Sequence, residues 1–197
     1  MILGITGCPG SGKSLLARHI ADTGWMFVDA DDIGREVVEG DVGIIEALRN
    51  TFGEDIVGND GRLDRRLLAR RAFSDAEHTK RLNGIVHPEL IKRLKARIEG
   101  QRGESRKAVV DCALIFEWGI GESFDCVVCV AADEHLRRAR LRERDGRSVM
   151  EIDDMFAAQM PESDKIRRAD ITVMNNESMQ RIKKIGTMLA EIDRYYI

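Results

Sequence analysis

Residues Gly7 to Ser14 have the types and the spacing needed to bind phosphate. They read Gly-Cys-Pro-Gly-Ser-Gly-Lys-Ser, a complete match to the pattern G-x-x-x-x-G-K-S/T. Glycines let the backbone turn sharply and bring its amide N–H groups close to phosphate oxygens, and a following helix adds its positive end. In this pattern Lys13 reaches the β- and γ-phosphates of a nucleotide, and the Ser14 hydroxyl binds Mg²⁺. A turn that only connects a strand to a helix needs neither side chain.

The flanking segments predict the strand and the helix that this phosphate loop requires. Residues 1–5 are apolar and predict a buried strand, and residues 15–21 predict a helix. A second apolar run, at residues 25–28, ends in carboxylates at positions 29, 31 and 32. Ligands bind at the carboxyl ends of the strands in open α/β sheets, so these acids should reach the nucleotide edge. One of them could instead cap the next helix, at residues 33–39.

A third apolar strand is predicted at residues 108–110, and it also ends in an acid, Asp111. An acid after an apolar strand is typical of the second half of a phosphate-loop site, where it holds Mg²⁺ directly or through water. The pattern is short, and a strand-end turn residue is the alternative interpretation.

Between these strands the sequence loses its strand signal and predicts short helices. This stretch is rich in arginine, which indicates either a solvated helix face or a place for an anionic substrate; the residues are Arg62, Arg65, Arg66, Arg70 and Arg71. Pro88 is expected to break a helical stripe and to display His87 at a bend between two helices. His87 is then either a capping or packing residue or a contact to substrate.

A second arginine-rich segment follows the predicted strand at residues 124–132. Asp133 is expected to cap the helix, and Arg137, Arg140 and Arg144 share one face of it. That face could close over a triphosphate, or it could be an ordinary surface paired with glutamates. Residues 148–151 form a capping box that opens another helix, and Pro161 ends it. Two helices joined by a tight turn predict a hinged lid.

The remainder of the chain predicts one polar stretch, a last strand and a last helix. The strand at residues 171–174 ends at Asn175-Asn176, again at the nucleotide edge. The final helix carries an apolar face that should cover the sheet; it comprises Ile182, Ile185, Met188, Leu189 and Ile192.

Length and composition restrict the class of protein. The 197 residues suit one α/β domain, and a net charge of −3 argues against nucleic acid as an obligatory partner. No apolar run approaches the roughly 20 residues of a membrane span, and because strand and phosphate loop start the chain we expect no signal peptide and a cytoplasmic protein. Cys126 and Cys129 lie within a predicted buried strand and point to opposite faces, so we interpret this C-x-x-C as core rather than a redox or zinc motif.

A phosphate loop alone leaves kinases, GTPases and ATP-driven machines as candidates. No N-K-x-D tetrapeptide for guanine recognition occurs in the chain, and motor ATPases are usually longer. A short chain with a helical insertion and an arginine-bearing lid favours a small-molecule kinase, whose lid excludes water so that phosphate goes to substrate.

Together these motifs resemble the dephospho-coenzyme A kinase family nearly end to end. The matching segments are Gly4-Ile5-Thr6-Gly7 with the phosphate loop, Asp29-Ala30-Asp31, Phe52-Gly53, Asp60 to Arg65, Leu82-Asn83, His87-Pro88, Asp111, Leu114 to Glu117, Arg140-Leu141, Arg144-Asp145-Gly146, Gln159, Ala169-Asp170 and Asn175-Asn176. Two departures are Cys8-Pro9, where the family has a small or apolar pair, and Ala113, where it usually has proline. Neither removes a polar group that the chemistry needs.

The resemblance implies transfer of the γ-phosphoryl group of ATP to the ribose 3′-hydroxyl of dephospho-coenzyme A, the last step of coenzyme A synthesis. It also implies a five-stranded parallel sheet with helices on both faces, in a single domain with a helical substrate-binding insertion and a helical lid. We expect the core at residues 1–31, 105–133 and 169–197, the insertion at 32–104 and the lid at 134–168. A monomer is expected, with an oligomer left open.

The family pattern also carries residue roles onto this sequence. The catalytic candidates are Asp31, which would orient the ribose hydroxyl and accept its proton, with Lys13 and Arg140, which would balance charge on the transferred group. The ATP-binding candidates are Gly7, Cys8, Pro9, Gly10, Ser11, Gly12, Lys13, Ser14, Leu15, Arg144 and Asn175. The substrate-binding candidates are Thr6, Asp31, Arg65, Asn83, His87 and Glu117, and the Mg²⁺ ligands are Ser14 and Asp111. A nucleoside or nucleoside-monophosphate kinase and a non-catalytic nucleotide-binding regulator are the alternatives.

Overall fold

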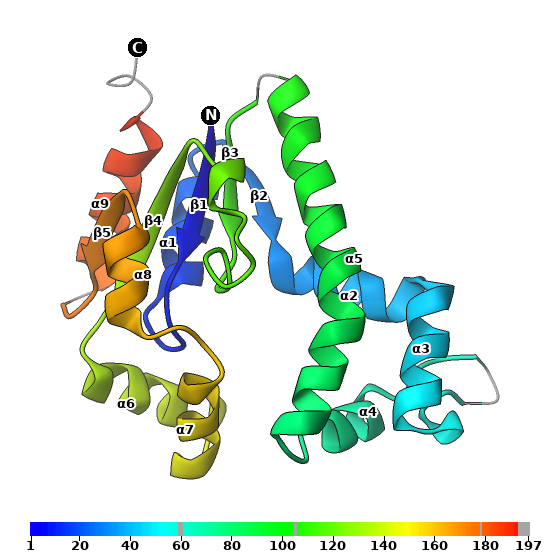
Figure 1. The fold of residues 1–197 in the computed structure, drawn as a ribbon. Helices are drawn as coiled ribbons and strands as arrows, with labels where there is room; N and C mark the ends of the chain where they lie inside the picture. Colours follow the sequence, from blue (N-terminus) through cyan, green and yellow to red (C-terminus); the bar gives the residue numbers. More distant parts are fainter. Residues whose placement is uncertain (59–60, 105, 178, 193–197) are drawn as a thin grey trace. The chain divides into compact units, whose positions relative to one another are not determined.

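A five-stranded parallel sheet forms the centre of the larger part of the chain (Figure 1). The computed structural model describes residues 1–58, 61–104, 106–177 and 179–192. The strand order is β2-β3-β1-β4-β5, with the bounds β1 Ile2–Thr6, β2 Met26–Asp29, β3 Ala108–Asp111, β4 Cys126–Ala131 and β5 Ile171–Met174. The predicted fold class is thereby confirmed. The strands read as continuous apolar runs because a parallel sheet is buried on both faces.

Helices cover both faces of this sheet. On one face α1 (Lys13–Ala21) and α9 (Met179–Ala190) bury Leu16, Ile20 and Ile182 against strand residues such as Ile5. On the other face α8 (Glu162–Arg168) packs on β4. There Gly4 lies so close to Ile115 and Phe124 that a Cβ would sit 2.9 Å from each side chain. The remaining helices of this part are α6 (Glu134–Asp145) and α7 (Val149–Ala157), with the 3₁₀ turn η2 (Gly121–Ser123).

The chain divides into two compact units, residues 1–29 with 98–197 and residues 30–97. The second unit, which we call the helical unit, begins with α2 (Ala30–Gly40) immediately after the last residue of β2. It continues through α3 (Val42–Phe52), η1 (Glu54–Ile56) and α4 (Arg65–Ala72) into α5 (Ala76–Gly103), whose last residues belong to the first unit. The domain boundaries proposed from the sequence stay predictions.

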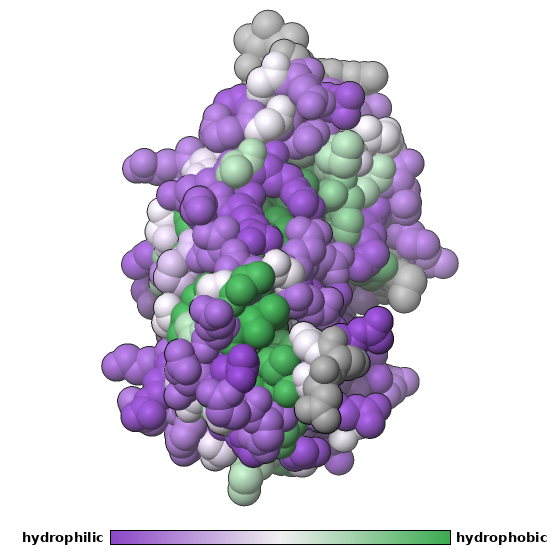
Figure 2. Space-filling view, turned by 90° about the vertical axis from the view of Figure 1, so that its right-hand side faces the viewer, coloured by the Kyte–Doolittle hydropathy of each residue, from purple (hydrophilic) through white to green (hydrophobic). Residues whose placement is uncertain are grey.

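The helical unit has buried apolar residues of its own on α2, α3 and α5. Ile33, Leu48 and Leu94 are each at most 1% exposed, and the Arg93 guanidinium on α5 lies 2.7 Å from Asp41, which also caps α3. Figure 2 shows a largely hydrophilic surface with one hydrophobic area in its lower half. Val42 and Phe73 are the large hydrophobic side chains of the described helical unit that are most exposed. Within the described residues, no helix combines the length and the apolar character that crossing a membrane requires.

The four cysteines are free and buried, and for Cys126 and Cys129 this confirms the prediction from the sequence. Burial raises the pKa of Cys126 to about 11 and that of Cys129 to about 12, so neither is a thiolate at neutral pH. The C-x-x-C is part of the core.

Four local expectations are wrong. Pro88 lies inside α5 and does not break it, so His87 is a half-buried helical residue and not a residue at a bend. Helix α5 continues for 15 residues beyond the proline, to Gly103, so packing on both sides of Pro88 outweighs its lost hydrogen bond. The polar stretch after Pro161 is a helix, α8. Met188, expected on the covering face of α9, is 64% exposed. Asp133 precedes α6, but its carboxylate accepts a hydrogen bond from Asn176 and makes no cap.

Candidate active site

The phosphate loop begins at the end of the fully buried β1 and ends in the first turn of α1. Gly10 and Gly12 have φ angles of 77° and 95°, which favour glycine. Added Cβ atoms there would lie 2.6 Å from the Arg137 carbonyl and 2.4 Å from the Asn175 amide. No side chain caps α1, and its first turn has no acid. Its N-terminal N–H groups therefore face a site suited to an anion.

Lys13, Ser14 and Asp111 come together beside this loop. The Lys13 ammonium lies 3.4 Å from Asp111 Oδ1 and donates to the Ser14 hydroxyl over 3.4 Å. Asp111 is the last residue of β3, in register with Ile5 of β1 and Asp29 of β2. The carboxylate is only 5% exposed. The structure thus gathers the phosphate-binding lysine and both predicted Mg²⁺ ligands at one sheet edge.

The Asp111 carboxylate fits a role as ligand to a hard cation. Its Oδ1 is buried and has no hydrogen-bond partner among the described residues, although it lies within ion-pair distance of Lys13. No cluster of three or more His, Cys, Asp or Glu side chains suited to a metal occurs in the described chain. Mg²⁺ usually takes only one or two protein ligands and completes its shell with phosphate oxygens and water. Ser14 and Asp111 are such a pair.

Arg140 and Asn175 hold the outer side of the phosphate loop. Arg140 of α6 donates to the Gly10 carbonyl over 3.2 Å and to the Asn175 carbonyl over 2.7 Å. The Asn175 side chain donates to the Ser11 carbonyl over 2.7 Å, and the residue is 8% exposed. Arg140 and Asn175, far apart in the sequence, therefore both contact the loop, and their roles toward ATP stay predictions.

The other two arginines of the predicted face have different partners. Arg144 makes a bidentate pair with Asp145, with both distances 2.7 Å, and this carboxylate raises the pKa of the guanidinium. Arg137 is buried, donates to the Ala132 carbonyl, lies 3.3 Å from Glu162 and stacks 4.5 Å above the Phe156 ring. The Arg137 side chain is thus part of the packing between α6, α7 and α8, and Arg140 is the arginine of this face whose guanidinium donates to the loop.

Two of the predicted substrate-binding residues lie in the first unit. Thr6 is fully buried, and its hydroxyl donates to the Ala113 carbonyl over 2.9 Å. Glu117 lies 2.8 Å from the ammonium of Lys165 and accepts a hydrogen bond from the Met160 N–H. Its second oxygen, Oε2, is buried without a hydrogen-bond partner among the described residues.

The other four predicted substrate-binding residues belong to the helical unit. Asp31 is exposed in the first turn of α2, two residues after Asp29. Arg65 opens α4 and pairs with Glu39 at 3.0 Å. Asn83 and His87 are half-buried on α5, one helical turn apart. Burial lowers the pKa of His87, so this imidazole is neutral more readily than a free histidine.

Sequence reasoning missed one charged residue of the first unit, Lys165 of α8. It is 0% exposed although it lies in a run of charged residues, Glu-Ser-Asp-Lys-Ile-Arg-Arg. Such a run predicts a solvated surface, and its one buried member follows only from the packing of α8 on β4. The signal available in the sequence was helical periodicity in this run, which could have indicated that one face of a helix is buried.

The parallel sheet, the phosphate loop and the lysine beside a strand-end acid define a nucleotide-binding domain of the phosphate-loop class. Shikimate kinase from Acinetobacter baumannii shares this fold, with a TM-score of 0.55 at 16% identity over 99% of this chain and 93% of that one. The sequence profile of dephospho-CoA kinase matches residues 1–181. The chain therefore belongs to the dephospho-CoA kinase family.

Individual relatives agree with this assignment. Dephospho-CoA kinase from Shouchella clausii is 39% identical over 89% of this chain and 90% of its own length. That from Corynebacterium glutamicum is 34% identical, covering 96% and 98% of the two chains. Among solved structures, TT1252 from Thermus thermophilus has a TM-score of 0.76 and 36% identity over 98% of this chain and 97% of that one. Dephospho-CoA kinase from Campylobacter jejuni has a TM-score of 0.75 at 20% identity, covering 100% and 98%.

Proposed function

We propose that the protein transfers the γ-phosphoryl group of ATP to the ribose 3′-hydroxyl of dephospho-CoA, which yields CoA and ADP. Membership of the dephospho-CoA kinase family over residues 1–181 supports the acceptor. The observation that carries the chemistry is the Lys13 ammonium at 3.4 Å from the buried Asp111, beside a helix terminus with no side-chain cap. A lysine, a hard-cation ligand and free amide donors in one place suit a nucleoside triphosphate.

The donor side of the reaction is assigned to the phosphate loop and Arg140. The loop amides and Lys13 bind the phosphates and balance the charge that develops on the transferred group. Arg140 keeps the loop in shape through the Gly10 carbonyl, and its position beside the loop supports a second role in neutralising phosphate charge. Gly7 through Leu15, with Asn175 and Arg144, complete the proposed ATP site.

Ser14 and Asp111 would hold a magnesium ion. The orphaned, buried Oδ1 of Asp111 supports this assignment. A bound Mg²⁺ would supply charge neutralisation for the phosphate oxygens.

The acceptor side is assigned to Asp31 and to side chains of the helical unit. Asp31 would orient the 3′-hydroxyl and accept its proton, which is enough because phosphoryl transfer depends mostly on positioning. Arg65, Asn83 and His87 are proposed contacts to dephospho-CoA, together with Thr6 and Glu117 of the first unit. The helical unit would hold the coenzyme moiety. The four reduced cysteines favour the cytoplasm as the location.

The first experiment measures conversion of ATP to ADP with Mg²⁺ and one acceptor at a time. Dephospho-CoA is compared with a panel of nucleosides and nucleoside monophosphates, and the product is identified by mass. Turnover with dephospho-CoA alone, giving CoA, is the expected result. Turnover with a nucleotide acceptor would overturn the acceptor assignment and keep the phosphate-loop chemistry. Tight ATP binding without turnover on any acceptor would favour a nucleotide-binding regulator.

A further inference from the structure

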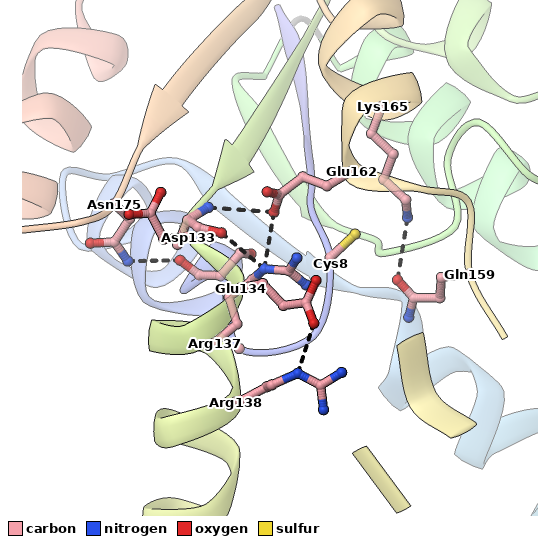
Figure 3. A network of polar contacts seen from close by, with 12 residues as sticks. Cys8, Asp133, Glu134, Arg137, Arg138, Gln159, Glu162, Lys165 and Asn175 are labelled. Atoms are coloured by element: carbon pink, nitrogen blue, oxygen red, sulfur yellow. Dashed lines mark hydrogen bonds and ion pairs between the residues drawn. The ribbon is translucent and has the colours of Figure 1, made fainter. Parts of the chain in front are cut away.

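Lys165 is the largest side chain of the described residues that is completely buried, and the proposed mechanism gives it no role. Its ammonium has three acceptors within reach: the Ala113 carbonyl at 2.6 Å, Glu117 Oε1 at 2.8 Å and Gln159 Oε1 at 3.3 Å. A lysine ammonium has three N–H donors, so these contacts satisfy it completely. Figure 3 shows the side chain pointing from α8 toward Gln159.

Each of the three acceptors belongs to a segment that also contacts the proposed site. Ala113 lies two residues after Asp111, and its carbonyl also accepts a hydrogen bond from Thr6, the residue before the phosphate loop. Gln159 lies in the connection between α7 and α8. The next residue, Met160, is held by both of its backbone groups.

The two backbone contacts of Met160 close a ring through the phosphate loop. Its N–H donates to Glu117 Oε1 over 2.9 Å, and its carbonyl accepts from the Cys8 thiol over 3.7 Å. Burial raises the pKa of Cys8, although Lys165 and Arg137 oppose this effect. The thiol therefore stays protonated and can donate this hydrogen bond. The ring runs from Thr6 through Ala113, Lys165, Glu117 and Met160 to Cys8 and back along the chain to Thr6.

A buried ion pair is a poor device for stability alone. Removing a charge from water costs several kcal/mol, and a pair of well-packed apolar side chains is often at least as stable. What the charged pair adds is a defined geometry, because the three N–H donors of the ammonium bond well only to acceptors held in one arrangement. In phosphoryl transfer, positioning makes up most of the catalysis, and a displacement of about 1 Å can cost about 100-fold in rate.

We infer that Lys165 is a positioning residue for phosphoryl transfer. From its buried place in α8 it fixes three segments in one arrangement: the phosphate loop, the strand end that carries Asp111, and the connection between α7 and α8. Lys165 does not touch substrate or phosphate; it acts through Ala113, Glu117 and Gln159. This inference rests on the proposed function.

The test compares Lys165→Met with the double variant Lys165→Met/Glu117→Gln, and uses the exposed Lys184→Met of α9 as the matched control. The single variant leaves Glu117, whose side chain is 19% exposed, without its cation and should lower the urea midpoint. The double variant removes both charges and should regain the wild-type midpoint. With saturating dephospho-CoA, its kcat should nevertheless stay about 10- to 100-fold below wild type. Lys184→Met should match wild type in every measurement.

The outcomes separate a positioning role from a structural one. A double variant with wild-type midpoint and wild-type kcat would show that the pair only balances charge, and would overturn the inference. A raised KM for dephospho-CoA at unchanged kcat would do the same, because loss of the proposed Glu117 contact to substrate would then account for the whole effect. If the double variant does not fold, Gln159→Leu serves, since it cuts one link and keeps the ion pair. It should lower kcat about threefold to tenfold, and unchanged kcat would overturn the inference.

Failure of the proposed function would be recognised separately. Wild-type protein that does not phosphorylate dephospho-CoA would contradict that function before any variant is compared. Wild-type turnover together with an unaffected double variant would contradict the role of Lys165 alone.

Discussion

Lys13 is the residue on which the donor chemistry depends most directly. Its ammonium lies 3.4 Å from both Asp111 Oδ1 and Ser14 Oγ. Residues 7–14 contain no second lysine that could replace it. We expect Lys13→Ala to lower kcat about 100- to 1,000-fold or more, as loss of a donor to transition-state charge does. Steady-state kinetics with ATP and dephospho-CoA measure this, with Lys184→Ala as control. Near-normal rates would contradict the phosphate-loop interpretation itself.

Asp31 is the proposed base on the acceptor side. Asp31→Asn keeps the size of the side chain and removes its ability to take a proton, so ATP binding should persist while kcat falls about 100- to 10,000-fold. Calorimetric ATP titration and turnover assays give the two quantities. Asp32→Asn is the matched control because that neighbouring carboxylate is exposed and paired with Arg35. Unchanged turnover of Asp31→Asn would remove it from the mechanism.

Residues in a strict pattern could be predicted from the sequence, and residues defined by packing could not. Lys13, Ser14 and Asp111 were expected to share a site, and they lie together. The expectation that Arg137, Arg140 and Arg144 act on one face was too simple, because only local packing decides that Arg137 is buried and that Arg144 pairs with Asp145. The role of Lys165 depends on contacts 52 residues away in sequence at Ala113. No spacing rule encodes such a contact.

At the scale of elements, α7 begins with a capping box that the sequence predicted. The Ser148 hydroxyl accepts from the Glu151 N–H, and the Glu151 carboxylate accepts from the Ser148 N–H. Ser148→Ala should lower the free energy of unfolding by about 0.5–2 kcal/mol, because a backbone donor loses its partner. Urea unfolding followed by circular dichroism measures it. Ser163→Ala, within α8, should have a smaller effect, and equal losses in both variants would contradict the capping role.

Strands were easier to predict than helices. The bounds of β3 and β5 agree with the apolar runs at 108–111 and 171–174, because buried parallel strands carry an uninterrupted hydrophobic signal. Helices were predicted where apolar residues recur, and that rule missed α8. The proline rule also failed for α5, where the long helix on both sides of Pro88 outweighs one lost hydrogen bond.

At the scale of the whole molecule, His87 should make stability depend on pH. Burial lowers its pKa below the ordinary value of 6.5, so the unfolded chain binds the proton more readily than the folded protein. The stability that depends on a neutral His87 is fully present above about pH 6.5. It is lost as the pH falls through the pKa of His87 in the folded protein. Urea unfolding between about pH 7.5 and about pH 5 should show a shallower loss for His87→Asn than for wild type. The exposed His135→Asn should behave like wild type, and equal slopes for all three proteins would contradict this prediction.

The overall architecture was predictable because local signals and the family resemblance point to the same answer. The division of the chain into core, insertion and lid stays a prediction. The sequence places the insertion at residues 32–104, and the structure has a compact helical unit at residues 30–97. A helix such as α5, which begins in one unit and ends in the other, leaves no composition change to mark a boundary.

The direct junction of β2 and α2 has a consequence for descent. The helical unit begins immediately after Asp29 and occupies one continuous stretch of the sequence, residues 30–97. That stretch contains Asp31, Arg65, Asn83 and His87, whereas the phosphate loop, Asp111 and Arg140 lie outside it. Replacement of this single segment would therefore remove four of the six proposed contacts to dephospho-CoA and leave the proposed donor residues in place. Kinases with this sheet and different acceptors are what such replacements would produce.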